Sequence, residues 1–284
     1  MTGQSAIRIG LLIPDVLGTY SDAGNATVLA QRARWRAIPA EVLVIDAGST
    51  PPASLDVYLL GGGEDTAQLF AAQWLSRHAQ LRHALTHRAR TLAVCAGLQV
   101  LGRSMRDRRG RDHPGLGVLD ISTAPGRHRA VGEIVTTCAI PGTGQLIGFE
   151  NHLGITTLGP DTGCLGTVLT GAGNGTRDHA GRRTEGVLTD RVIGSYLHGP
   201  VLARNPALAD HILGLIAGQD LAPIELPDQA AMRQTHPDPL TVRGWLRRRP
   251  RIPQHITPPT DPGACRQAAD RVAQPMPDPD SVRR

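Results

Sequence analysis

The sequence predicts an α/β protein with an open, mostly parallel sheet, helices on both faces of that sheet, and a proline-rich C-terminal tail. Short apolar runs alternate with longer amphipathic stretches, which is the pattern of repeated β–α–β units. From about residue 220 this periodicity ends, and 12 of the 22 prolines lie in 220–284. We therefore expect one domain at 1–219 and, at 220–284, an extension that is mostly disordered or bound to a partner.

The elements of the domain follow in order along the chain. Runs of apolar residues predict strands at 7–13, 41–46, 56–60, 91–94 and 192–197. Amphipathic stretches predict helices at 26–36, 66–88, 97–104 and 206–217. After about residue 115, strand-like segments alternate with glycine-rich turns, at 133–139, 148–151 and 167–169.

All 30 basic side chains are arginines, because the sequence contains no lysine. This composition excludes a Schiff-base lysine, a Ser-Lys dyad and the lysine of a P-loop. We therefore expect that another chain binds any ATP that the reaction needs, and we expect no cofactor in this chain. The net charge of +5 is modest, and Asp107 and Asp112 interrupt the arginine cluster at 103–111, so we expect no nucleic-acid partner.

The cysteines and the N-terminus indicate the compartment. The cysteines lie far apart, without a CxxC pair or metal-ligand spacing, at Cys95, Cys138, Cys164 and Cys265. We interpret them as reduced thiols and expect no metal site. The N-terminus lacks a basic segment followed by an apolar one, and no run of 18 apolar residues occurs. We therefore predict a cytoplasmic protein that does not span a membrane.

The segment TLAVCAGLQVLG at 91–102 is the sharpest local indication of chemistry. An apolar strand leads into Cys95, and the small residues Ala96 and Gly97 allow a tight turn into a helix. The N-terminus of that helix lowers the pKa of a thiol, and nearby backbone amides stabilise an oxyanion. Cys95 is therefore a candidate nucleophile, although a buried structural cysteine fits the same pattern.

Two other strands end in residues suited to the same chemistry. DVYLLGGGED at 56–65 ends in glycines whose amides can approach an anion, and RVIGSYLHGP at 191–200 delivers His198 to a loop. Since the carboxyl ends of parallel strands form the site of an open α/β sheet, we expect Cys95 and His198 at one edge. His198 is our first candidate for the base, and His152 is the alternative.

These segments together resemble class I glutamine amidotransferases. VCAGLQ at 94–99 is similar to the CxGxQ turn of that family, and YLHGP at 196–200 resembles the histidine segment of its cobyric-acid-synthase-like branch. TYSDAGN at 19–25, GFENHLG at 148–154 and TEGV at 184–187 resemble one subgroup, the glutaminase subunits of lipid II isoglutaminyl synthases. The resemblance covers about residues 7–217 and implies a flavodoxin-like sheet.

By this resemblance, Cys95 would attack the side-chain amide of L-glutamine and form a thioester, which water would then release as glutamate. His198 would deprotonate the thiol and protonate the departing ammonia. The amide of Ala96, with an amide of the turn at Gly62 and Gly63, would form the oxyanion hole. The resemblance places Arg129 on the glutamine α-carboxylate, and Arg127 is the near alternative.

The segment after His198 departs from the family pattern. Many class I amidotransferases carry an acid two residues after this histidine, whereas Pro200 stands there in this sequence. Either a Cys-His dyad suffices, or the acid comes from elsewhere in the chain, or a partner supplies it, which is the option we favour. The other motif residues are expected to line the site, face the partner or form structural turns: Asp22, Asn25, Glu150, Asn151 and His152.

The resemblance also implies a heterodimer with a MurT-like Mur ligase subunit. That partner would use ATP and Mg²⁺ to amidate the D-glutamate of the lipid II stem peptide to D-isoglutamine in peptidoglycan synthesis. Three alternatives stay open: ammonia supply to a cobyric-acid-synthase-type amidation, a non-catalytic regulatory module, and a nucleic-acid binder that uses the arginine cluster. An inert Cys95→Ala variant would indicate the regulatory module.

Overall fold

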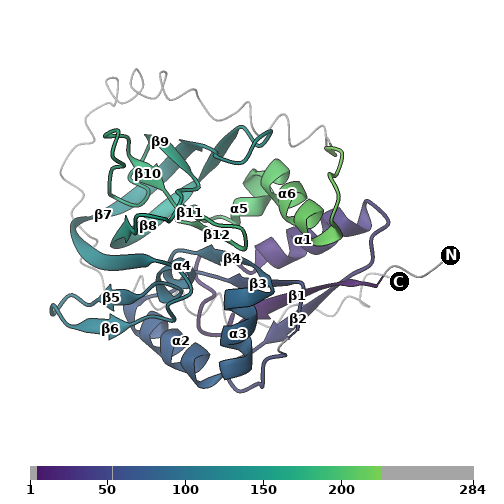
Figure 1. The fold of residues 1–284 in the computed structure, drawn as a ribbon, viewed down its shortest axis with the longest axis horizontal. Helices are drawn as coiled ribbons and strands as arrows, with labels where there is room; N and C mark the ends of the chain where they lie inside the picture. The colour runs from purple at the N-terminus through teal and green to yellow at the C-terminus, as the bar shows by residue number, and fades with distance from the viewer. Residues whose placement is uncertain (1–4, 53, 225–284) are drawn as a thin grey trace, which may run out of the picture. The chain divides into compact units, whose positions relative to one another are not determined.

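A six-stranded central sheet organises the structure, a computed structural model that describes residues 5–52 and 54–224 (Figure 1). The strand order is β11-β12-β4-β3-β1-β2, and every neighbouring pair is parallel except β11 with β12. The strands are β1 (Ile7–Leu12), β2 (Ala40–Ile45), β3 (Val57–Leu60), β4 (Arg90–Val94), β11 (Val187–Leu188) and β12 (Val192–Ser195). This arrangement confirms the predicted mostly parallel α/β sheet.

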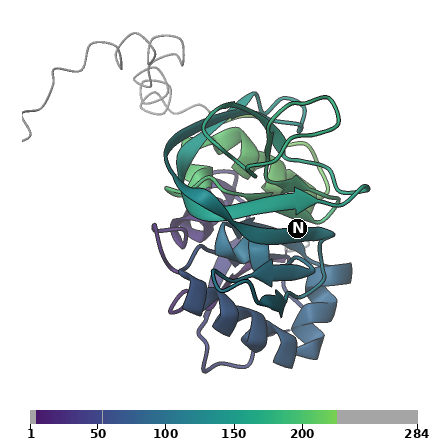
Figure 2. The same ribbon diagram turned by 90° about the vertical axis from the view of Figure 1, so that its left-hand side faces the viewer.

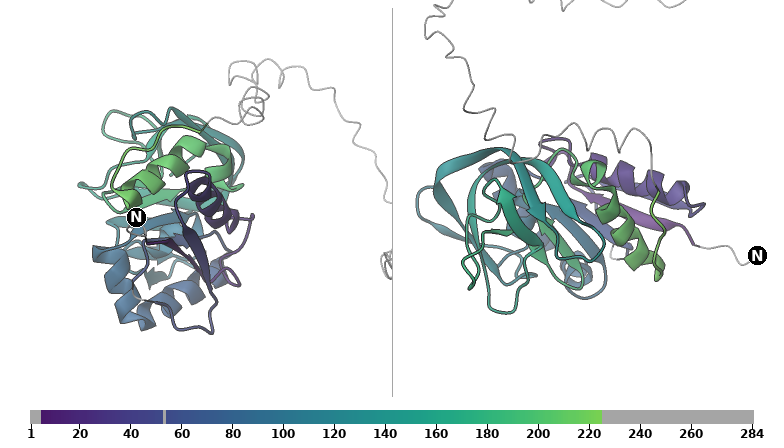
Figure 3. Two further views of the ribbon diagram at one scale, coloured as in Figure 1. Left: turned by 90° about the vertical axis from the view of Figure 1, so that its right-hand side faces the viewer. Right: turned by 90° about the horizontal axis from the view of Figure 1, so that it is seen from above.

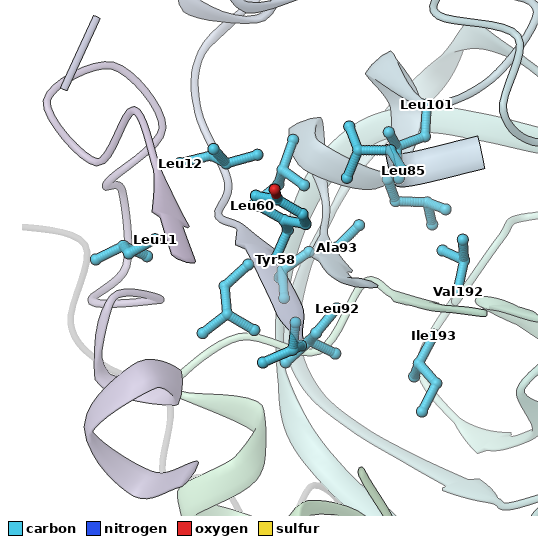
Figure 4. Packing of buried hydrophobic residues seen from close by; sticks show 14 of the residues in the cluster. Leu11, Leu12, Tyr58, Leu60, Leu85, Leu92, Ala93, Leu101, Val192 and Ile193 are labelled. Carbon is cyan, nitrogen blue, oxygen red and sulfur yellow. The ribbon is translucent and has the colours of Figure 1, made fainter. Parts of the chain in front are cut away.

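The middle strands of this sheet are buried on both faces, which explains their continuous apolar sequences. Every residue of β3 and β12 is buried, and so are four of the five in β4. Figure 4 shows side chains of these three strands together, including Tyr58, Leu92 and Ile193. The core is therefore made mainly of aliphatic side chains around the strands that end at the candidate site.

Helices cover the two faces of the central sheet. One face carries α1 (Gly24–Arg34), α5 (Val201–Arg204) and α6 (Pro206–Ala217), and the other carries α2 (Asp65–Arg77) and α3 (Ala79–His87) (Figures 1 and 3). The short helix α4 (Ala96–Val100) follows β4 directly and packs against α2. Helices thus lie on both faces, as the sequence predicts.

A second sheet lies beside the β12 side of the central sheet (Figures 1 and 2). Its strand order is β10-β9-β7-β5-β6, and β8 pairs with β7. The strands are β5 (Ser104–Arg106), β6 (Asp112–Pro114), β7 (Ile121–Thr137), β8 (Gln145–Leu158), β9 (Gly166–Thr170) and β10 (Thr184–Glu185). The pairing of β7 with β8 shifts register between Pro125 and Ala130, and the intervening bulge carries Arg127 and Arg129.

Two of the predicted helices differ from the structure. The helix expected at 66–88 is broken at His78, whose ring nitrogen Nδ1 bonds to the carbonyl oxygen of Trp74. The backbone amide of His78 donates to the carbonyl of Leu75 instead. The imidazole has therefore replaced the helical hydrogen bond that the amide of His78 would donate to the carbonyl of Trp74. The helix expected at 97–104 ends at Val100, because Ser104 already belongs to β5, which pairs with β6 and β7.

The described chain ends along helix α1. Gly218 adopts a left-handed conformation (φ 67°) and ends α6. In the segment that follows, the carbonyl oxygen of Ala222 accepts a 2.8 Å hydrogen bond from Arg36, which lies just after α1. Most of the predicted extension, at 225–284, lies outside the described residues, and Cys265 lies there too. Within the described ranges, no helix has the length and apolar character needed to cross a membrane.

A buried ion pair joins α1 to α6. Arg32 donates two hydrogen bonds to the carboxylate of Asp210, at 2.6 and 2.7 Å, and Arg36 adds a third contact at 2.9 Å. Both members of the pair are almost fully buried. A buried charge that loses its partner keeps its desolvation penalty, so each member of this pair depends on the other.

We expect Arg32→Ala to lower the free energy of unfolding by about 3 kcal/mol, because Asp210 would lose its bidentate partner while staying buried. The control is Arg182→Ala, which removes an exposed pair with Asp178 and should leave stability unchanged within error. Urea unfolding followed by circular dichroism measures both variants. Equal midpoints for the two variants would contradict this role of the buried pair.

Candidate active site

Cys95 stands at the turn between β4 and α4, in a backbone conformation that L side chains rarely adopt. Its φ is 51° and its ψ is −107°. The amide of Cys95 donates to the carbonyl of Ser195 at 2.8 Å, and the amide of Gly97 donates to that of Gly61 at 3.0 Å. A Cβ atom at position 97 would lie 2.7 Å from Leu60 Cβ, so glycine permits the tight turn that the sequence predicts.

Burial controls the state of this thiol. Cys95 is only 7% exposed, and burial together with the negative charge of Asp22 raises the pKa of its thiol to about 12. The amide of Ala96 and the charge of Arg129 lower the pKa by smaller amounts. The helix N-terminus thus lowers the thiol pKa as expected, but the pKa is raised overall, because desolvation outweighs this effect in the buried position. A neutral thiol needs a base before it can attack.

His198 and Cys95 meet across Gly62. A Cβ atom built on Gly62 would lie 2.6 Å from His198 Cε1 and 3.5 Å from Cys95 Cβ, so both side chains border the same small space. His198 follows β12 and is fully buried, with backbone hydrogen bonds to Phe149 in both directions. Its Nε2 atom has no hydrogen-bond partner among the described residues. The structure thus brings the predicted nucleophile and base together at one sheet edge.

The other ring nitrogen of His198 faces a carboxylate from this same chain. Nδ1 lies 3.0 and 3.2 Å from the two oxygens of Asp22, and the side chains of both residues are at most 1% exposed. Asp22 belongs to the turn before α1, in which Tyr20 (φ 64°) and Ser21 (φ 61°) are both left-handed. We favoured a partner as the source of an acid for His198, but this chain already places one against the ring.

The predicted oxyanion donors are not all available. Ala96 is the first residue of helix α4, and its amide points at the Cys95 sulfur. This amide is therefore suitably placed to stabilise an oxyanion that forms next to the thiol. The amide of Gly62, in contrast, donates to Asp22 Oδ2 at 2.8 Å. Of the two turn residues that we predicted, Gly62 already donates its amide to this carboxylate, and Gly63 does not. The candidate donors of the oxyanion hole are therefore the amides of Ala96 and Gly63.

A cavity of about 260 Å³ opens onto Cys95. Its lining includes Gly63, Glu64 and Arg129, whereas Arg127 is not part of it. This favours Arg129 over Arg127 as the cation that could meet a substrate carboxylate. Arg129 Nε donates to Asn151 Oδ1 at 2.5 Å, and the Arg129 guanidinium lies 3.9 Å from Glu64. Arg129 is thus held at the cavity wall, and the carboxylate of Glu64 lies beside it on the same wall.

The alternative base, His152, is held in a different way. Its ring stacks on Tyr196 with centroids 4.0 Å apart, and its Nδ1 atom donates to the carbonyl of Gly154. Glu150 accepts hydrogen bonds from the amides of Ala172 and Gly173, which fixes a loop of the second sheet. These bonds give His152 and Glu150 structural partners within the described part of the chain.

Asn25 also has a structural partner, since its Oδ1 atom accepts a hydrogen bond from the amide of Leu202 in α5. Asn151 and His152 both line the cavity, and Asn151 accepts a hydrogen bond from Arg129 there. No group of three or more His, Cys, Asp or Glu residues that could hold a metal ion occurs within 5–52 and 54–224. The site is therefore built from a thiol, an imidazole, a carboxylate and an arginine.

A buried glutamate supports this site from behind. Glu185 Oε1 accepts hydrogen bonds from Ser195 Oγ and from the amide of Tyr196, both at 2.8 Å. Ser195 also supplies the carbonyl that accepts the hydrogen bond from the amide of Cys95, and Tyr196 lies two residues before His198. Complete burial raises the pKa of Glu185 to about 7. The sequence motif TEGV contains this residue, but no spacing rule predicts that it contacts the end of β12.

Comparison with known proteins agrees with this geometry. Residues 8–206 match the family model of the CobB/CobQ-like glutamine amidotransferase domain. The chain belongs to this family. The chain is also similar to a curated protein from Staphylococcus aureus (strain N315), the lipid II isoglutaminyl synthase (glutamine-hydrolyzing) subunit GatD. It is 36% identical over 203 residues, which cover 70% of this chain and 79% of the relative. The predicted amidotransferase family and enzyme class are therefore confirmed.

Other proteins are similar to parts of this chain. The GatD subunit of Streptococcus pneumoniae (strain ATCC BAA-255 / R6) is 32% identical, over 72% of this chain and 77% of its own. The cobyric acid synthase of Methylocella silvestris is 33% identical, over 56% of this chain but only 32% of its own. A solved structure titled "Crystal structure of glutamine amidotransferase" superposes with a TM-score of 0.50 at 18% identity, covering 74% of this chain and 98% of its own. That likeness concerns the fold alone.

The raised pKa of Glu185 predicts a pH dependence of stability. Between about pH 4.5 and 7 the folded chain holds a proton that the unfolded chain releases, so this group destabilises the fold progressively as pH rises. Above pH 7 the loss amounts to about 3 kcal/mol. Glu185→Gln mimics the protonated acid, so we expect its free energy of unfolding, relative to wild type, to rise from pH 5 to pH 8. Urea unfolding at each pH measures this, and parallel curves for the two proteins would contradict it.

Proposed function

We propose that this chain is the glutaminase subunit of a lipid II isoglutaminyl synthase. It would hydrolyse L-glutamine and pass the ammonia to a partner subunit. The observation that carries the proposal is the 36% identity to a GatD subunit over most of both chains, together with the meeting of Cys95, His198 and Asp22 around one glycine. Neither of these observations depends on the other.

The buried site suggests how the thiol would react. Asp22 keeps a proton on His198 Nδ1, so the Nε2 atom is free to accept the proton of the Cys95 thiol. The sulfur then attacks the side-chain amide carbon of glutamine, and the protonated His198 gives its proton to the departing ammonia. A thioester with the γ-carboxyl group of glutamate results. Water attacks this thioester, with His198 now acting as base, and releases glutamate and the thiol.

Two further parts of the cavity would support these steps. The amides of Ala96 and Gly63 would stabilise the negative oxygen that forms in each attack, a contribution of about 3 kcal/mol per donor. Arg129 would bind the α-carboxylate of glutamine, since a guanidinium pairs with a carboxylate through two parallel hydrogen bonds. Glu64, on the same wall of the cavity, is placed to face the α-ammonium group.

The amidation itself would take place on a partner. Activating a carboxylate for amide formation consumes ATP, and a chain without lysine lacks the usual phosphate-binding side chain. We infer a heterodimer with a MurT-like Mur ligase that binds ATP and Mg²⁺ in the cytoplasm and converts D-glutamate of the lipid II stem peptide to D-isoglutamine. Supply to a cobyric acid synthesis is the second candidate, but the similarity spans only 32% of such a synthase.

The proposed mechanism predicts graded losses of glutaminase activity. Cys95→Ser should abolish glutamine hydrolysis, and Asp22→Asn should lower kcat by at least about 100-fold, because an amide does not hold His198 in the required tautomer. Asp15→Asn is the control, since Asp15 accepts its hydrogen bonds, among the described residues, from the amide of Ala47 in a neighbouring turn. Glutamate release by the purified chain, alone and with a MurT-like partner, measures all three variants.

Two outcomes of this assay would contradict the proposal. Amidation of lipid II by Cys95→Ser in the complex, with glutamine as the sole nitrogen source, would remove the thioester mechanism. Wild-type rates for Asp22→Asn would show that the contact with His198 has no part in catalysis. Because Asp22 comes from this chain, we also expect the chain alone to hydrolyse glutamine, and activity that depends wholly on the partner would oppose an acid supplied in cis.

A further inference from the structure

The turn that carries Asp22 also reaches the predicted substrate anchor, through Tyr20. The hydroxyl of Tyr20 accepts a hydrogen bond from Asn151 Nδ2 at 2.5 Å, and the amide oxygen of the same Asn151 accepts from Arg129 Nε, also at 2.5 Å. This chain of bonds joins Tyr20, near the N-terminus, to the bulge of β7. The orientation of Arg129 therefore depends, through Asn151, on Tyr20.

The ring of Tyr20 has a second neighbour. It lies 4.6 Å, centroid to centroid, from the ring of His198 at an angle of 53°, and 6.4 Å from Phe149. His198 has no exposed surface, so its hydrogen bond to Asp22 is shielded from bulk solvent. Excluding water strengthens a hydrogen bond between charged or polar groups. The Tyr20 ring is thus one wall of the space in which His198 and Asp22 interact.

The backbone of the turn fixes both of these contacts. Tyr20 and Ser21 are left-handed, which costs energy for residues other than glycine, and the amide of Thr19 bonds to the carbonyl of Gly62. Two residues after Tyr20, Asp22 accepts the hydrogen bond from the amide of Gly62. A single strained turn therefore presents a ring and a carboxylate to His198 and a hydroxyl to Asn151.

We propose that Tyr20 is a positioning residue that couples the glutamine anchor to the base: its hydroxyl orients Arg129 through Asn151, and its ring holds His198 against Asp22. The inference rests on the proposed glutaminase function and assigns separate tasks to the two ends of one side chain. The hydroxyl serves substrate binding, whereas the ring serves the chemical step.

Two substitutions separate these tasks. Tyr20→Phe keeps the ring and removes the hydroxyl, so we expect the KM for glutamine to rise about fivefold to tenfold, the effect of one lost hydrogen bond, with kcat within twofold of wild type. Tyr20→Leu also removes the ring, so we expect the same rise in KM and, in addition, a fall in kcat of at least about tenfold. Steady-state glutaminase kinetics measure both variants.

Asn151→Ala tests the hydrogen-bonded route to Arg129. We expect it to raise the KM as Tyr20→Phe does, and the double variant to be no worse than either single one, because both substitutions break the same route. The matched control is Tyr58→Phe, which removes a hydroxyl that donates to the carbonyl of Pro52, before the start of β3, whereas the candidate site lies after its end. Its KM and kcat should equal those of wild type.

Some results would overturn the proposal. These are an unchanged KM in Tyr20→Phe, a similar kcat in Tyr20→Leu and Tyr20→Phe, or full additivity of Tyr20→Phe with Asn151→Ala. A wild-type chain that does not hydrolyse glutamine, alone or in its complex, would instead refute the proposed function. The ring contact is tested by the NMR chemical shifts of the His198 ring protons, which lie beside the Tyr20 ring. They should change in Tyr20→Leu and not in Tyr20→Phe, and unchanged shifts in both variants would overturn the ring's role.

Discussion

The candidate site depends on the absence of a side chain at Gly62. Three segments converge there, and a Cβ atom at this position would lie 2.6 Å from His198 Cε1, 3.2 Å from Asp22 Oδ2 and 3.5 Å from Cys95 Cβ. The amide of Gly62 also holds the carboxylate of Asp22, so the same residue leaves room for the base and fixes its acid. Any side chain here would separate groups that must touch.

The parallel sheet supplies the rest of this arrangement. Gly62, Cys95 and His198 follow the neighbouring strands β3, β4 and β12, whose carboxyl ends lie at one edge because the strands are parallel. Burial of these strands excludes water from the edge, which raises the pKa of the Cys95 thiol and makes its activation depend on His198. The core that stabilises the fold thus sets the chemistry of the thiol.

Strand order explains which parts of the site sequence reasoning could find. Cys95 and His198 each end a buried apolar run, and runs of this kind are visible in the sequence. The contact of Asp22 with His198 joins residues 176 positions apart and depends on left-handed backbone at Tyr20 and Ser21, which these residue types do not signal. The overall rise in the pKa of the Cys95 thiol was not predicted for a related reason, since a local motif shows a helix N-terminus but not the depth of burial.

The most direct test of this account is glutamine hydrolysis by the purified chain with Gly62→Ala, compared with Gly48→Ala. A methyl group at position 48 would meet no atom within 4 Å, whereas at position 62 it would collide with His198. We predict that Gly62→Ala lowers kcat by at least about 100-fold, because base and nucleophile are forced apart, and that Gly48→Ala leaves it unchanged. Wild-type hydrolysis by a folded Gly62→Ala variant would contradict the account.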